Sequence, residues 1–196
     1  MIENYKKYLN YLNDKLLGFF DNQKEYIKCS KGCSKCCQTG EYPYSETEFR
    51  YLIAGSLELD KETQNIIEKN ILDVQRRQKN FSGEKYTYVC PFLINDMCSV
   101  YEHRGIICRT FGLIDNTNES AKLPFCAHDG LNYAEVADFE KNILSEEKYS
   151  KLNLKNKPLG YNISYDFLTS EKFERVFNFQ FGEKKSLISW FRKNSW

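Results

Sequence analysis

The stretch Cys29-Ser30-Lys31-Gly32-Cys33-Ser34-Lys35-Cys36-Cys37 places four thiols within nine residues. Thiolates are soft ligands for zinc, for copper(I) and for the iron of iron–sulfur clusters. A glycine before the second cysteine permits the tight turn that a loop folded around an ion requires. Four further cysteines follow much later in the chain, at Cys90, Cys98, Cys108 and Cys126. The stretch therefore predicts a metal site that is shared with a distant part of the chain.

The cysteine spacing leaves the number of metal ions open. It is Cys-x3-Cys-x2-Cys-Cys and then, after 52 residues, Cys-x7-Cys-x9-Cys-x17-Cys. Eight thiolates permit two four-cysteine zinc sites, a binuclear cluster, or one or two iron–sulfur clusters such as 4Fe-4S. Adjacent residues point their side chains in different directions in most backbone conformations. We therefore expect Cys36 and Cys37 to serve two ions, to bridge a polynuclear site, or to leave one thiol outside it.

Composition and charge narrow the class of protein. The chain has 196 residues, of which 41% are hydrophobic, so we expect one folded domain with its own core. The formal net charge is only +1, which argues against a nucleic-acid partner. The first residues lack the charged-then-apolar layout of a secretory signal, and no apolar run is long enough to span a membrane, so we expect a cytoplasmic protein without a membrane partner. In a reducing compartment, cysteines favour metal binding over disulfides.

Hydrophobic spacing and capping signals predict a mainly α fold with little β. Apolar residues at three- and four-residue steps predict a helix over 2–20 that packs on the core rather than on a membrane surface. Ser45 and Glu48 form a capping-box pattern for a helix that ends at Gly55. Further helices are expected over 60–79, over 134–144, and at two places in the aromatic segment beyond residue 170.

Shorter elements are expected between these helices. Residues 86–89 alternate as a strand does, and the Asn95-Asp96 pair predicts a turn that brings Cys90 and Cys98 together in a small hairpin or knuckle. Residues 99–104 fit one helical turn. Residues 115–122 are polar and predict a loop, and 151–158 form the one candidate linker. We therefore expect a single domain, 1–196, with a cysteine-cluster core at 29–128 and helical flanks at 1–28 and 130–196.

The cysteines and the residues beside them resemble a known family. The segments that carry the resemblance are Cys29-x3-Cys33-x2-Cys36-Cys37, Cys90-Pro91-Phe92-Leu93, Cys98-Ser99-Val100-Tyr101-Glu102-x-Arg104 and Cys108-Arg109-Thr110-Phe111. Together they resemble the YkgJ-type cysteine-cluster family of zinc- or iron-chelating proteins, and the flagellin lysine methylases carry a similar cysteine pattern. The resemblance covers roughly residues 29–128.

What the resemblance implies is a ligand set rather than a reaction. It implies that the metal ligands are Cys29, Cys33, Cys36, Cys37, Cys90, Cys98 and Cys108, with Cys126 as the eighth. One departure is Gly105, which stands where the family usually has a proline after the arginine. The loss of proline loosens the turn before Cys108 but removes no ligand.

A few residues near the cysteines are candidates for further roles. Arg104 and Arg109 flank Cys108, where they either balance the charge of the thiolates as outer-sphere partners or bind an anionic substrate. Tyr101 is either a further outer-sphere partner of the thiolates or, as is commoner for a tyrosine, packs in the core. The chain has two histidines, and His128, two residues after Cys126, is better placed than His103 to be an extra ligand.

Three functions compete on these observations. The first is a metal-binding protein that holds zinc or iron through the cysteines. The second is an iron–sulfur redox or methyl-transfer enzyme, although no nucleotide or S-adenosylmethionine motif is present. The third is a protein-interaction module in which the metal only staples the fold and the aromatic C-terminal helices dock an unidentified partner. Motifs for phosphate loops, serine nucleophiles and paired-histidine zinc proteases are missing from the sequence, and whether the protein is an enzyme stays open.

Overall fold

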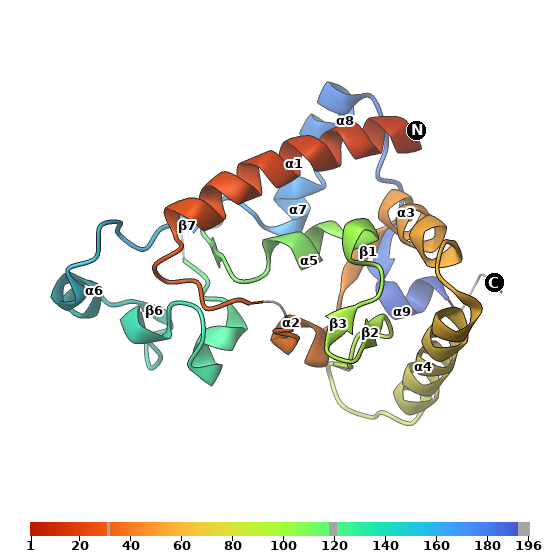
Figure 1. Cartoon of the computed structure of the whole chain (residues 1–196), viewed down its shortest axis with the longest axis horizontal. Helices are drawn as coiled ribbons and strands as arrows, with labels where there is room; N and C mark the ends of the chain where they lie inside the picture. The colour runs from red at the N-terminus through yellow and green to blue at the C-terminus, as the bar shows by residue number, and fades with distance from the viewer. Residues whose placement is uncertain (31, 118–120, 192–196) are drawn as a thin grey trace. The chain divides into compact units, whose positions relative to one another are not determined.

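The computed structural model describes residues 1–30, 32–117 and 121–191 (Figure 1). The chain divides into two compact units. The first unit consists of Met1, Glu3–Lys31 and Arg109–Asn178, and the second of Ile2, Gly32–Cys108 and Phe179–Trp196. About 50% of the structure is helical and 11% is strand, which confirms a mainly α protein with little β. The single domain expected from chain length stays a prediction.

In the first unit, the long helix α1 (Ile2–Asn22) carries the apolar stripe that its sequence predicts. Its buried residues recur every three or four positions, so they share one face of the helix. The Tyr8 ring packs against Phe173 and Phe177 of α8 (Glu171–Phe177), at 5.2 and 5.4 Å between ring centroids. Its hydroxyl donates to the Leu168 carbonyl at the end of α7 (Tyr165–Leu168). The expected helix over 2–20 and a helix beyond residue 170 are confirmed.

The middle of the first unit is built from short elements. In chain order they are β4 (Ile114–Asp115), the 3-10 turns η2 (Phe125–Asp129) and η3 (Ala134–Val136), β5 (Ala137–Asp138), β6 (Ile143–Leu144), α6 (Glu146–Leu152) and β7 (Gly160–Tyr161). Strand β4 pairs in parallel with β7. The predicted loop over 115–122 includes residues 118–120, which lie outside the described residues; at its edges the backbones of Asp115 and Lys122 form a bridge.

The helix predicted over 134–144 is wrong. Residues 137–138 and 143–144 instead form an antiparallel hairpin, with Ala137 opposite Leu144. Asn142 adopts a left-handed backbone angle, φ 52°, that turns the chain between the strands. The helical spacing misled because Phe139 and Ile143 are exposed rather than buried on a shared face.

The segment predicted as a linker, 151–158, is held within the first unit. The Gln23 side chain donates to the Lys157 carbonyl, and Glu25 accepts from the Asn156 amide. The Tyr26 hydroxyl donates to the Asn156 carbonyl at 2.6 Å. These bonds satisfy main-chain groups that a solvated linker would leave to water.

In the second unit, the capping box predicted for α3 (Glu46–Leu57) is present. The Ser45 hydroxyl accepts from the Glu48 amide, and the Glu48 carboxylate accepts from the Ser45 amide. The predicted stop at Gly55 is wrong, because the helix continues to Leu57. A Cβ at Gly55 would lie 2.2 Å from the His103 ring, so this glycine makes room for a side chain instead of ending the helix.

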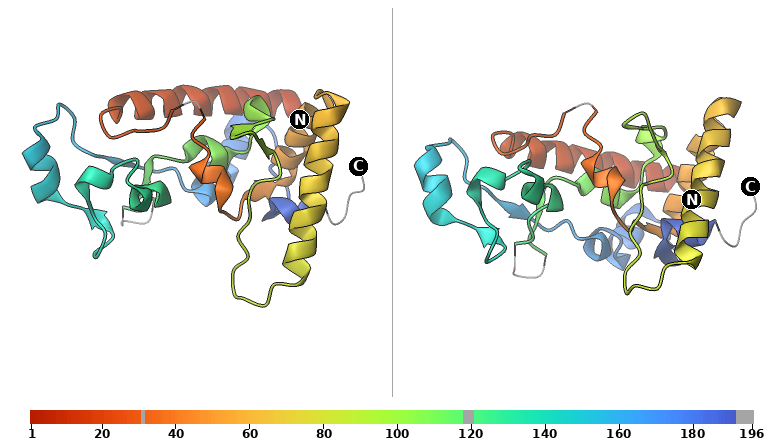
Figure 2. Two further views of the ribbon diagram at one scale, coloured as in Figure 1. Left: turned by 60° about the horizontal axis from the view of Figure 1, so that its bottom comes forward. Right: turned by 90° about the horizontal axis from the view of Figure 1, so that it is seen from below.

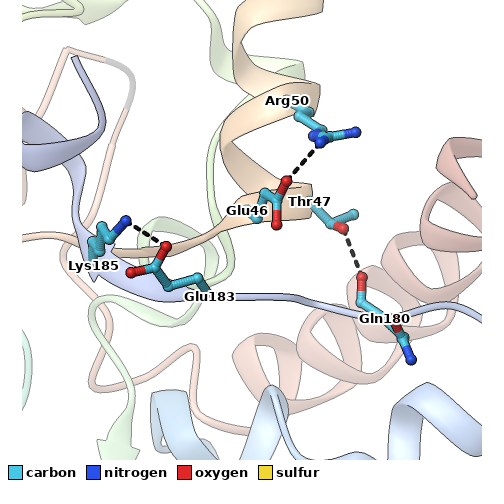
Figure 3. A network of polar contacts seen from close by, with 6 residues as sticks. All are labelled: Glu46, Thr47, Arg50, Gln180, Glu183 and Lys185. Carbon is cyan, nitrogen blue, oxygen red and sulfur yellow. Dashed lines mark hydrogen bonds and ion pairs between the residues drawn. The ribbon is translucent and has the colours of Figure 1, made fainter. Parts of the chain in front are cut away.

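The C-terminal segment of the second unit packs along the start of α3. Strand β1 (Pro43–Ser45) pairs antiparallel with β8 (Lys184–Ser186), a pairing that the sequence did not indicate. In Figure 3 the Thr47 hydroxyl donates to the Gln180 carbonyl at 2.6 Å, while Glu46 pairs with Arg50 and Glu183 with Lys185. Helix α9 (Leu187–Trp190) follows, with a buried tryptophan whose indole N–H donates to the Tyr44 carbonyl.

Helix α4 (Lys61–Lys79) begins at the predicted cap, where the Asp60 carboxylate accepts from the Thr63 amide. After it the chain loops back beside the helix (Figure 2), with the Tyr86 hydroxyl bonded to the Val74 carbonyl. The strand predicted over 86–89 is reduced to one isolated bridge between Tyr88 and Gly40. That bridge sets residues 88–90 beside residues 37–40.

Candidate metal centre

Cys36 and Cys37 lie in the single helical turn α2 (Lys35–Gln38). Their sulfurs are 3.9 Å apart, so the expectation that adjacent cysteines point in different directions is wrong here. Two sulfurs bound at about 2.3 Å to one tetrahedral ion would be about 3.8 Å apart, so the observed spacing suits ligation of a single ion.

The main chain places Cys90 and Cys98 beside this pair. The Cys90 amide donates to the Cys37 carbonyl at 2.8 Å, and the Leu93 amide donates to the Cys90 carbonyl at 3.0 Å. Strands β2 (Leu93–Ile94) and β3 (Met97–Cys98) then form the predicted hairpin, with Leu93 opposite Cys98.

The turn of this hairpin has the geometry that its residues favour. Asn95 and Asp96 both have positive φ, 50° and 59°, as a two-residue type I′ turn requires. The Asp96 carboxylate also accepts from the Ser34 hydroxyl at 2.8 Å, which ties the turn to the first cysteine segment. The expectation that a turn at Asn95-Asp96 forms a hairpin is confirmed.

Two tyrosines connect Cys108 to the other cysteines. Cys108 lies in α5 (Ile106–Thr110), and its sulfur is 3.8 Å from the Tyr44 hydroxyl. Tyr42, two residues before, donates its hydroxyl to the Cys36 carbonyl at 3.2 Å. Both tyrosines are buried; Tyr44 lies in β1, and Tyr42 directly precedes it. Neither role could be predicted, because nothing local in the sequence relates residues 42–44 to Cys108.

The buried carboxylate of Glu48 fixes the start of α5. One of its oxygens accepts from the Ser45 amide and the other from the Ile106 amide, at 2.9 and 2.8 Å. The same residue therefore caps α3 and orients the helix that carries Cys108. Only the first of these two roles could be predicted from the capping-box pattern.

Five thiols of the second unit thus share one neighbourhood, which we call the five-thiol cluster: Cys36, Cys37, Cys90, Cys98 and Cys108. Their electrostatic coupling agrees with the geometry. Burial raises the pKa of the Cys90 thiol well above its usual range, and Cys108 and Cys98 raise it further. Burial and the neighbouring Cys98 likewise raise the pKa of Cys108 to about 12. These thiols disfavour one another's negative charge.

Cys36 differs from its neighbours. The hydrogen bond that it shares with Cys37 lowers the pKa of Cys36 to about 7, and Arg104 acts in the same direction. The same bond raises the pKa of Cys37. Arg104 also lowers the pKa of Cys108. The guanidinium therefore acts electrostatically on these two thiols. The outer-sphere role predicted for Arg104 and Arg109 stays a prediction.

The other candidate residues of this region have packing roles. Tyr101 is 58% exposed, so the expectation that it packs in the core is wrong. Its ring instead lies under the Arg104 guanidinium, at 3.6 Å from ring centroid to Cζ. His103, in the 3-10 turn η1 (Tyr101–His103), packs its ring on Tyr51 at 4.5 Å between ring centroids. The single helical turn predicted over 99–104 is confirmed by η1.

The first unit contains Cys29 and Cys126, and here Asn132 is the organising residue. Its side-chain amide nitrogen donates to the Cys29 sulfur at 3.2 Å and to the Gly112 carbonyl at 2.9 Å. Its carbonyl oxygen accepts from the Lys28 amide at 2.7 Å. Asn132 is fully buried, and the sequence did not single it out.

Three other predicted residues of the first unit have different surroundings. Cys126 is buried in η2, and His128 in the same turn is exposed, with its ring 4.8 Å from that of Phe139. Arg109 is buried and donates to the Asn13 side chain of α1 at 2.9 Å. Ligation by Cys126 and by His128 stays a prediction. Cys33 lies in the second unit, half-buried just before α2.

The donor set fits a thiophilic metal. All eight cysteines lie in the described residues, and none of them is in a disulfide. Within those residues, no three side chains of the ligating types (His, Cys, Asp, Glu) are already arranged to hold an ion. The five-thiol cluster nevertheless supplies more soft donors than the four that a zinc ion or a 4Fe-4S cluster takes.

A comparison with family models agrees with this chemistry. Residues 28–127 match the model CxxCxxCC, described as "Putative zinc- or iron-chelating domain". The chain belongs to this family. The match includes all eight cysteines and extends over both units. No curated protein matches the chain, and no solved structure does. No helix in the described part of the chain is long and apolar enough to cross a membrane.

Proposed function

We propose that this protein binds zinc or iron through cysteine thiolates, with the five-thiol cluster of the second unit as the core of the site. The observation that carries the proposal is the convergence of three cysteine segments by main-chain contacts. A backbone hydrogen bond joins the Cys36-Cys37 pair to the Cys90–Cys98 hairpin, from the Cys90 amide to the Cys37 carbonyl. The hydroxyls of Tyr42 and Tyr44 contact the Cys36 carbonyl and the Cys108 sulfur at the start of α5. Cys29, Cys33 and Cys126 complete the eight-cysteine set that family membership suggests.

The charge around the five-thiol cluster supports the same proposal. Four thiolates around Zn²⁺ carry a net charge of about −2, so a nearby cation lowers the cost of assembling them. Arg104 supplies that cation within the second unit, and its guanidinium is held in place by a bond to the Tyr101 carbonyl at 2.7 Å. When bound, zinc would hold the segments together, whereas an iron–sulfur cluster would also carry an electron. The residues around the five-thiol cluster favour metal binding itself and no particular reaction.

Anaerobic purification followed by elemental analysis and a visible spectrum tests the proposal. Stoichiometric zinc in a colourless protein would make the site a zinc centre. Iron and sulfide in a brown protein would make it an iron–sulfur centre and would favour the redox alternative. Protein that contains neither metal, and takes up neither after anaerobic reconstitution, would rule the proposal out.

Single substitutions test the ligand set. Cys90→Ser, Cys98→Ser and Cys108→Ser should each lower the metal content per folded chain, and a matched Ser99→Ala change should leave it unaltered. Cys36→Ser and Cys37→Ser, made separately, decide whether both adjacent thiols are ligands. If both lower the metal content, both thiols are ligands; if one does not, that thiol lies outside the site.

A further inference from the structure

The Tyr44 hydroxyl has one proton to donate, and the Cys108 sulfur is the acceptor beside it. The oxygen accepts a hydrogen bond from the Gly105 amide at 2.9 Å, which occupies one of its lone pairs. The Cys108 sulfur lies 3.8 Å from the same oxygen, within hydrogen-bonding distance for sulfur. The phenol is 2% exposed, so water does not compete for its proton.

Metal binding would settle which atom donates across this contact. A hydroxyl has one proton to donate, and a thiol has one as well. A metal-bound cysteine is a thiolate and has lost its proton, so it can only accept. With the Gly105 amide already donating to the oxygen, the Tyr44 hydroxyl must then donate to the sulfur.

We infer that Tyr44 is a positioning residue of the metal centre, whose hydroxyl donates a hydrogen bond to the Cys108 thiolate and so orients and tunes that ligand. The inference rests on the proposed function. It adds a residue that lies outside the cysteine pattern. Partners of this kind fix a ligand's orientation, and their removal typically costs about 10–100-fold in metal affinity.

The adjoining residues explain how the contact is kept. The Tyr44 backbone is held by the β1–β8 pairing and by the Trp190 indole, which donates to the Tyr44 carbonyl at 3.0 Å. On the other side, Gly105 lets the ring approach, because a Cβ at this position would lie 2.6 Å from the Tyr44 ring. A proline at 105 would also lack the amide that orients the hydroxyl.

Cobalt(II) binding to the full chain tests the inference, because cobalt reports on its thiolate ligands through charge-transfer absorption. The variant is Tyr44→Phe, and the matched control is Tyr8→Phe. Tyr8 is an equally buried phenol in the first unit, and its hydroxyl donates to the Leu168 carbonyl and not to a sulfur.

We expect Tyr44→Phe to bind one equivalent of cobalt with about 10–100-fold lower affinity and with the charge-transfer band moved to longer wavelength, because the sulfur loses a donor and releases electron density more easily. Tyr8→Phe should keep the wild-type band. A Tyr44→Phe spectrum identical to that of wild type would overturn the inference and leave metal binding intact. A wild-type chain that binds no cobalt would overturn both.

A second measurement avoids the variant in case it does not fold. In the wild-type chain loaded with cadmium-113, the Tyr44 hydroxyl proton should show a scalar correlation to the metal through the Cys108 sulfur. A hydroxyl proton seen without that correlation, or lost to rapid solvent exchange, would contradict the inference.

Discussion

The surroundings of the cysteines differ between the two units. In the second unit, main-chain hydrogen bonds, a type I′ hairpin and a helix cap bring five thiols together. In the first unit, the contact of Cys29 depends on one side chain, Asn132, and Cys29 itself is exposed. Main-chain contacts therefore gather the cysteines of the second unit, whereas Cys29 is contacted by the side chain of Asn132.

Metal removal should produce the largest contrast between the units. A structural zinc contributes about 10–16 kcal/mol in small zinc peptides, which rivals the stability of a whole domain. We expect a chelator under reducing conditions to abolish hydrogen-exchange protection in α2 and in the 90–98 hairpin, while the amides of α1 keep theirs. Equal loss of protection in α1 would contradict this expectation and show that metal loss destabilises the first unit as well.

The features of the fold that could be predicted depend on residues that are close together in the sequence. The cap at Ser45, the start of α4 at Asp60 and the Asn95-Asp96 turn each depend on residues within three positions of one another, and all three are present. The cysteine spacing likewise indicated a shared site, and the Cys90–Cys98 hairpin was predicted because its turn residues favour positive φ.

The residues that were missed act over long separations. Tyr44 meets Cys108 across 64 positions, and Asn132 meets Cys29 across 103. A hydrogen bond between such distant residues leaves no periodic pattern in a single sequence. The errors at 134–144 and at Gly55 have the same origin, because hydrophobic spacing and a glycine do not reveal which tertiary neighbour will take the space.

Substitution of Glu48 should weaken the second unit more than any surface change does. Glu48→Gln keeps one oxygen acceptor and places an NH₂ group against an amide donor, either at Ser45 or at Ile106. We expect a loss of about 2–3 kcal/mol in the free energy of unfolding, measured by urea denaturation. Glu46→Gln is the matched control, because its ion pair with Arg50 is largely exposed and contributes about 0–1 kcal/mol. Similar losses in the two variants would argue against a special role for Glu48.

Substitution of Asn132 should loosen the first unit and spare the five-thiol cluster. Asn132→Ala removes the partners of the Lys28 amide and the Gly112 carbonyl, so we expect a loss of about 1–3 kcal/mol in stability. Metal content should fall less than it does in Cys90→Ser, as elemental analysis of the folded fraction would show. If Asn132→Ala empties the site completely, the segment at Cys29 is as essential to binding as the cluster is.

Two glycine substitutions should change the free energy of unfolding in opposite directions. Gly105→Ala puts a methyl group 2.6 Å from the buried Tyr44 ring, and overpacking of this kind costs about 1–3 kcal/mol. Gly18→Ala in α1 meets no atom within 4 Å and should stabilise that helix by about 0.5–1 kcal/mol. Urea midpoints measure both changes.

Cobalt affinity separates the two substitutions further. Gly105→Ala displaces the ring whose hydroxyl faces Cys108, so it should lower the affinity as well as the stability. Gly18→Ala should leave the affinity at the wild-type value, because it lies on an open face of a helix in the other unit. If Gly105→Ala is destabilised but binds cobalt as tightly as wild type, the packing around Tyr44 supports the fold alone. If Gly105→Ala lowers the cobalt affinity by more than its loss of folding stability accounts for, the close approach of Gly105 and Tyr44 supports the metal centre as well as the fold.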